Sequence, residues 1–148
     1  MAGTSVDLTP VAQALRARLW TYEPMSGAPM LASSLRGGLS ANGRPDEAMY
    51  PLAAFRLLNL AESAGYGGAR HGATLELFLF HRPRSEWSTV EALADTAVEA
   101  VTTYRDPAKG IQLCVLTDRD TLPPFSEVAD PEVVQARLVF SLVLYPAT

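Results

Sequence analysis

An ordered run of strand and helix patterns fills the second half of the chain, and it constrains the fold more than any other feature. The first segment of this run, residues 72–81, alternates with the two-residue period of a β-strand. One side of this strand holds Leu75, Leu77 and Leu79. The other side holds Glu76, Phe78 and Phe80. Because both sides are largely apolar, we expect one side to pack on helices and the other on a partner.

Residues 88–104 have the spacing of an amphipathic helix with an alanine-rich apolar face. Ser88 and Glu91 form an S-x-x-E capping box, in which each side chain satisfies a backbone N–H group of the first turn. The opposite face of this helix holds Glu91, Asp95, Glu99 and Thr103. We expect that face to contact either solvent or a polar surface of another subunit.

Three more segments are predicted to be strands. Residues 52–60 suit a helix or a strand by composition, but the glycine-rich stretch 63–72 that follows is typical of a hairpin connection, which favours a strand. Residues 111–117 and 134–145 alternate between the two sides of a sheet. The second side of the last strand holds Val139, Val143 and Tyr145. A sheet that is apolar on both sides predicts self-association.

The first half of the chain is less regular. Residues 9–20 predict an amphipathic helix, with Thr9 as its cap and Pro10 at its first position. Residues 21–49 lack periodicity and contain several prolines and glycines, which predicts one long irregular loop. Because loops beyond about 15 residues are commonly functional or disordered, we interpret this loop as an interaction surface. The polar stretch 118–131 is predicted to be a second loop.

Length and element order indicate one α+β domain over residues 1–148, with the order α-β-β-α-β-β. No apolar run approaches the ~18 residues of a membrane-spanning helix, and the N-terminus lacks the basic and apolar regions of a signal peptide. We therefore expect production in the cytoplasm and no contact with a membrane. The net charge of −4 and the scattered arginines argue against tight binding of nucleic acid.

Residues with catalytic or metal-binding chemistry are few. The single cysteine, Cys114, lies within a strand pattern and is interpreted as a buried apolar residue. His71 and His81 have no spacing typical of a zinc site. The consecutive charges at residues 118–120 cannot converge in an extended chain, so we interpret them as solvated loop charges. We expect neither catalysis nor a bound cofactor or metal.

The order of these elements resembles that of the tail terminator and tail completion proteins of long-tailed bacteriophages and gene transfer agents. The resemblance covers most of the chain: the helix with VAQALRARL, the Tyr-Pro that opens YPLAAFRL, the strand LELFLFHR, the helix STVEALADTAVEAVTTY and the closing strand ARLVFSLVLYP. It consists of layout and hydrophobic pattern, without an invariant chemical motif. Residues 21–49 and 118–131 have no counterpart in it.

The resemblance implies a mainly antiparallel four-stranded sheet with helices packed on one face. It also implies a homo-oligomeric ring, typically a hexamer, that caps the head-proximal end of the tail tube. This ring would stop addition of the major tail tube protein and offer a surface to a head-completion or neck protein, while DNA passes through its lumen. The expected location is the virion tail, after synthesis in the bacterial host cytoplasm.

Within this interpretation, long apolar side chains in the loop and on the second side of the strands suit contacts with the tail tube or a neighbouring subunit. The candidate contact residues are Met25, Met30, Leu31, Leu35, Arg36, Arg44, Phe78, Phe80 and Tyr145. Two alternatives stay open: another neck or tube-forming virion protein, and a small ligand-binding or enzymatic α+β domain.

Overall fold

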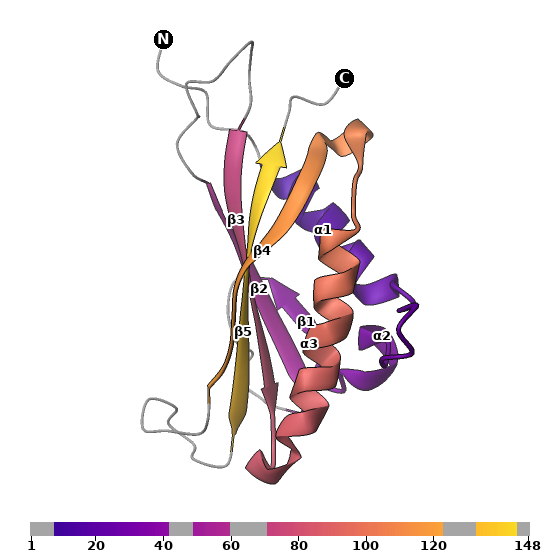
Figure 1. The fold of residues 1–148 in the computed structure, drawn as a ribbon, viewed down its shortest axis with the longest axis vertical. Coiled ribbons are helices and arrows are strands. Elements are labelled where there is room, and N and C mark those ends of the chain that lie inside the picture. Colours follow the sequence, from indigo (N-terminus) through magenta and orange to yellow (C-terminus); the bar gives the residue numbers. More distant parts are fainter. Residues whose placement is uncertain (1–7, 42–48, 60–70, 123–132, 145–148) are drawn as a thin grey trace.

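A twisted sheet covered by helices on one side forms the body of the protein (Figure 1). The structure is a computed structural model, and it describes residues 8–41, 49–59, 71–122 and 133–144. The α-helices within these ranges are α1 (Thr9–Thr21), α2 (Leu31–Ser34) and α3 (Trp87–Thr102). The strands are β1 (Leu39–Ala41), β2 (Leu52–Asn59), β3 (His71–His81), β4 (Ile111–Leu122) and β5 (Val134–Leu144). Two short 3-10 turns, Arg84–Glu86 and Pro107–Lys109, precede α3 and β4.

The sheet is mixed, with the strand order β1-β2-β3-β5-β4. β1 runs parallel to β2, and the other neighbouring strands are antiparallel. The α+β class is confirmed, whereas the predicted four strands and the order α-β-β-α-β-β are wrong. α2 and β1 lie within residues 21–49, which were expected to be one irregular loop. Elements of four and three residues are too short to show a period, so the sequence pattern missed them.

The side of the sheet that faces the helices forms the main core. Leu75, Leu77 and Leu79 of β3 are buried there, as the alternation predicted. α3 and α1 cover them with fully buried side chains, among them Leu93 and Leu15. The tight packing of α3 follows from the small residues on its buried face: Ala94, Ala97 and Ala100.

The predicted hairpin is confirmed for its two strands. β2 pairs with β3 from Leu52 opposite Phe80 to Asn59 opposite Ala73. Residues 60–70 lie outside the described residues, and they include most of the glycine-rich stretch 63–72 that joins the two strands.

Two local predictions are wrong. β4 does not end at Thr117 but continues to Leu122, so Asp118, Arg119 and Asp120 lie in a strand and not in a loop. α3 begins at Trp87 without a side-chain cap, and Ser88 and Glu91 form no capping box. The two differences have one cause, because Glu91 instead accepts hydrogen bonds from Arg119 and Thr121 of β4. Likewise Leu8, not Thr9, occupies the N-cap position of α1.

We predict that Leu138→Ala lowers the free energy of unfolding by about 2–5 kcal/mol, because it opens a cavity beneath the helices. Leu138 lies on β5 and is 0% exposed. Urea denaturation followed by circular dichroism measures the change. The matched control is Leu113→Ala on β4, where the side chain is 40% exposed and the expected loss is below about 1 kcal/mol. Equal losses for the two variants would contradict this description of the core.

Candidate assembly surfaces

Within the described residues, the helices cover one side of the sheet only, and we call the other side the open face (Figure 1). Its apolar side chains include three that are large and exposed: Leu58 at 41%, Leu113 at 40% and Val115 at 45%. Phe78, Val139 and Val143 on the same face are half-buried. The apolar second side predicted from the sequence is therefore present, but charged side chains interrupt it.

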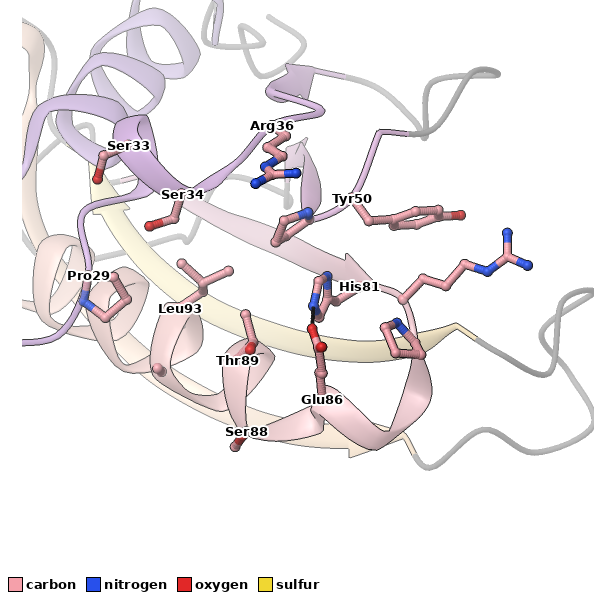
Figure 2. Close-up of a pocket in the computed structure, with 14 residues that line it drawn as sticks. Pro29, Ser33, Ser34, Arg36, Tyr50, His81, Glu86, Ser88, Thr89 and Leu93 are labelled. Atoms are coloured by element: carbon pink, nitrogen blue, oxygen red, sulfur yellow. Dashed lines mark hydrogen bonds and ion pairs between the residues drawn. The ribbon is translucent and has the colours of Figure 1, made fainter.

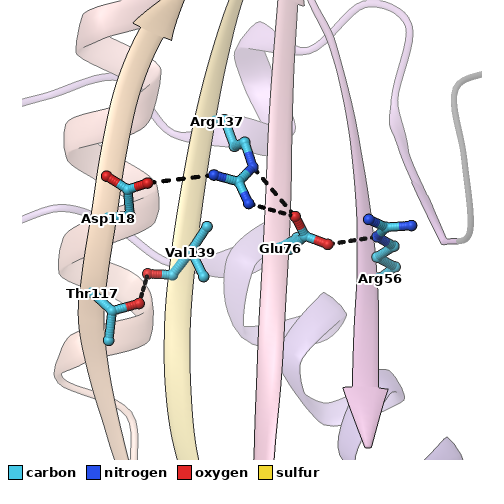
Figure 3. Close-up of polar contacts among 6 residues, drawn as sticks. All are labelled: Arg56, Glu76, Thr117, Asp118, Arg137 and Val139. Atoms are coloured by element: carbon cyan, nitrogen blue, oxygen red, sulfur yellow. Dashed lines mark hydrogen bonds and ion pairs between the residues drawn. The ribbon is translucent and has the colours of Figure 1, made fainter.

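These charges form a row across four strands of the open face (Figure 3). Arg56 on β2 donates through Nε to Oε1 of Glu76 on β3 at 2.6 Å. Arg137 on β5 donates through Nη2 to Oε2 of Glu76 at 2.9 Å, and its Nη1 reaches Oδ2 of Asp118 on β4 at 3.3 Å. Positive and negative groups thus alternate from β2 to β4. We call this set the ion row.

Glu76 is the buried centre of the ion row, with an exposed fraction of 5%. Burial alone would raise the pKa of its carboxyl, but hydrogen bonds from Arg56 and Arg137, together with their positive charges, lower the pKa below its ordinary value. Both carboxylate oxygens have a guanidinium partner, so the buried charge is satisfied.

A second exposed feature lies on the helix side, in the segment between α1 and α2. Met25 is 94% exposed there. Glu99 of α3 fixes the segment, because its Oε2 accepts hydrogen bonds from the hydroxyl of Tyr22 at 2.8 Å and from the backbone N–H of Met25 at 2.7 Å. The hydrogen bond from Tyr22, followed by that from the Met25 backbone, lowers the pKa of Glu99. Met25 is therefore presented to solvent from an anchored backbone.

Arg18 of α1 contacts the same segment through the ring of Tyr22. Its guanidinium lies 4.4 Å from the ring centre of Tyr22 and 5.2 Å from that of Tyr104. Its Nε also donates to the backbone oxygen of Ala100 at 2.9 Å. Burial, followed by the hydrogen bond to Asp106, raises the pKa of Tyr104 to about 12. Tyr104 thus stays neutral at physiological pH and supplies a ring face to the cation.

The polar face of α3 was expected to contact solvent or another subunit. In the structure its acidic side chains form ion pairs and hydrogen bonds within the same chain. Arg119 of β4 donates through Nη2 to Asp95 at 2.7 Å and to Glu91 at 3.0 Å. Burial alone would lower the pKa of Arg119, but the hydrogen bonds that it donates to Asp95 and Glu91 raise it. With Glu99 engaged as described above, this face ties α3 to β4 and to the Met25 segment.

An open hollow lies where α2, the start of β2 and the start of α3 meet (Figure 2). His81, which is 7% exposed, contacts Oε1 of Glu86 through Nε2 at 2.7 Å. Its buried Nδ1 has no hydrogen-bond partner in the ranges that the structure describes. Arg36, Tyr50 and the hydroxyls of α2 and α3 surround this pair in Figure 2. Tyrosine and arginine are enriched at protein interfaces, so Tyr50 and Arg36 suit contacts with another protein surface.

Candidate metal ligands are sparse in the part of the chain that the structure describes. Across the described residues, no three His, Cys, Asp or Glu side chains lie close enough together to hold a metal ion. Cys114 is buried as predicted, and burial raises the pKa of its thiol to about 11. None of the helices in the same ranges has the length and apolar character needed to cross a membrane.

The fold itself has a known counterpart. It is similar to that of a chain in the virion of a native gene transfer agent particle. The two share a TM-score of 0.63 and 14% sequence identity, and the match covers 90% of this chain and 96% of the other. No protein-family model matches the sequence, and no curated protein matches it. At this identity the likeness concerns the fold, and no residue's role is transferred by it.

The predicted contact residues occupy different environments. Met25 and Arg36 are exposed, and Met30 and Phe78 are half-buried. Leu31 and Leu35 are buried in the main core, and Phe80 is buried in a smaller cluster with Leu52 and Ala54. Arg44 and Tyr145 lie outside the described residues. The sequence interpretation missed the ion row and the exposed residues of β2 and β4, although the charged position within each alternating strand was a visible signal.

We predict that Glu76→Gln lowers the free energy of unfolding by about 1–3 kcal/mol at pH 7, because two arginines lose their buried carboxylate partner. Since folding lowers the pKa of Glu76, its contribution is complete above the ordinary carboxyl pKa and is lost as pH falls through the folded value. The unmodified chain should therefore lose more stability than the variant between about pH 5 and pH 2.

Urea denaturation across this pH range measures the difference. The control is Glu23→Gln, at an exposed position on the helix side. Parallel stability curves for the unmodified chain and Glu76→Gln would contradict the role assigned to Glu76.

Proposed function

We propose that the chain is a structural virion protein that forms a ring at the head-proximal end of a phage or gene transfer agent tail. The observation that supports this most is the fold shared with a gene transfer agent virion chain along nearly the full length of both. The surfaces are consistent with assembly, because they present exposed apolar groups and paired charges. The order of elements adds the resemblance to tail terminators described above.

In this proposal the ring, typically of six copies, ends polymerisation of the major tail tube protein and receives a head-completion or neck protein. The Met25 segment is our candidate for contact with the tube or with a neighbouring subunit, because an exposed methionine adapts to varied apolar surfaces. Arg36 at the rim of the hollow is a candidate for a polar contact in the same interface. The acidic chain leaves DNA free to pass through the lumen.

A second candidate has support from the same observation. The counterpart is described only as part of a virion, so another neck protein or a tube-forming subunit would have the same likeness. The two functions differ in how copies associate: a terminator closes into rings, whereas a tube subunit extends into filaments. Negative-stain microscopy of the purified chain at high concentration distinguishes them.

Particles produced without this protein test the proposal directly. We expect electron microscopy to show tails of uncontrolled length, or tails that are not joined to heads. Expression of the intact chain from a second gene copy is the control and should restore joined particles. Tails of normal length, joined to filled heads in its absence, would reject the proposed role.

A single substitution tests the Met25 segment. We predict that Met25→Asp reduces incorporation of the chain into particles by about tenfold, because a charge at the contact must lose its water on assembly. Quantitative immunoblotting of purified particles measures incorporation. The control Gln13→Asp changes an exposed residue of α1. Both variants should unfold at the temperature of the unmodified chain, and equal incorporation of the two would remove Met25 from the interface.

A further inference from the structure

The open face has an internal symmetry that its sequence positions do not reveal. Strand register places Leu58, Thr74, Ser141 and Val115 side by side across β2, β3, β5 and β4. From β2 to β4, the first and last side chains of this row are apolar, and the two between them are small and polar. It therefore has the same character from either end, with its midpoint between β3 and β5.

The charges at the two ends of the neighbouring ion row are opposite in sign. From β2 to β4 its charges are positive at Arg56, negative at Glu76, positive at Arg137 and negative at Asp118. Arg56 and Asp118, at its two ends, lie in one register row with Glu76 and Val139, whereas Arg137 lies two residues further along β5 (Figure 3). The ends of the row are therefore complementary in charge to the ends of a reversed copy.

We infer that a second copy of this chain covers the open face in a two-fold pair, with β2 of one copy opposite β4 of the other. The two-fold axis runs along the strands, between β3 and β5. Rotation about it sets Arg56 opposite the partner's Asp118, because these two residues lie in one register row. Glu76, whose charge is already paired within its own chain, lies opposite the partner's Val139. It also sets Leu58 opposite the partner's Val115, so apolar groups meet apolar groups.

The other two-fold arrangement is disfavoured by the same charges. An axis running across the strands through this register row would set Arg56 opposite the partner's Arg56, and Glu76 opposite the partner's Glu76. Like charges in direct opposition cost free energy, so the ion row selects between the two arrangements. Face-to-face packing at about 10 Å between sheets leaves room for the side chains of both copies.

The occupant is a second copy because the outer members of two register rows match when a copy is reversed: Leu58 with Val115, and Arg56 with Asp118. The area is modest: four strands and four residue rows cover on the order of 500 Å² per copy, which lies near the lower limit for specific interfaces. Leu58 and Val115 are only 41% and 45% exposed in the single chain, so a single chain can be stable without its partner. This agrees with a pair that forms reversibly. We therefore expect pairing that depends on protein concentration.

This pair goes beyond the proposed ring. A two-fold interface joins like surfaces and closes at two copies, whereas a ring needs head-to-tail contacts between unlike surfaces. The pair is a property of the purified chain and the ring is a property of the particle, so each is tested without the other.

Sedimentation equilibrium of the purified chain tests the pairing, with Leu58→Lys and Val115→Glu as the informative variants. Each variant alone should raise the dissociation constant of the pair by about tenfold or more, because a charge then faces an apolar partner. An equimolar mixture of the two should restore pairing, since the new lysine then faces the new glutamate. In one chain these positions are three strands apart, about 14 Å, too far for a direct ion pair.

The controls are Gln13→Lys and Thr102→Glu, which make the same changes of charge at exposed positions of α1 and α3. They should leave the dissociation constant unchanged, and circular dichroism should show all four variants folded. A chain that stays monomeric at every concentration would overturn the inference. Variants that weaken the pair singly but do not recover in the mixture would overturn the arrangement.

Cross-linking decides the orientation in a second way. With a short bismaleimide, a mixture of Leu58→Cys and Val115→Cys should form cross-linked dimers, and neither variant alone should do so. Cys114 is buried, and burial raises its pKa to about 11, so it stays out of the reaction. Cross-linking of Leu58→Cys alone would indicate the axis across the strands and overturn the inference.

Discussion

β3 lies between β2 and β5, with an apolar side and a side that holds a buried charge. The rest of the structure depends on covering the first side and pairing the charge on the second. One side consists of leucines that must be covered, and α3 and α1 cover them. The other side holds Glu76, whose charge is stable in a buried position only because β2 and β5 each supply an arginine. A slip of one residue would move the carboxylate into the leucine layer, so the ion row and the core fix the same register.

The sequence predicted the elements whose period repeats several times. β2, β3, β5, α1 and α3 are long enough for burial to appear as alternation or as a helical stripe, and all five are present. α2 and β1 were missed because four and three residues show no period, and because β1 is placed by hydrogen bonds to the start of β2. The end of β4 was missed for another reason: its polar residues look like a loop until the acids of α3 are placed opposite Arg119.

Candidate contact residues were harder to predict than the fold. Apolar residues in a polar stretch were interpreted as docking groups, yet Leu31 and Leu35 anchor α2 to the core, and of this set only Met25 is strongly exposed. The ion row joins residues 20 and 61 positions apart, so no local pattern shows that they meet. The alternation of its charges depends on the spatial order of β5 and β4, which is the reverse of their order along the chain.

β4 is the last strand of the sheet, so in the described part of the chain the outer row of its backbone groups faces no further strand. A long free edge can template strand addition, the first step of aggregation. Here two register shifts interrupt β4, near Ile111 and Leu116, and Asp118 and Asp120 add charge beside the second shift. Such irregularity resists growth of the sheet by added strands. Association of this chain with other proteins is thereby directed to side-chain surfaces, where the number of partners is limited by shape.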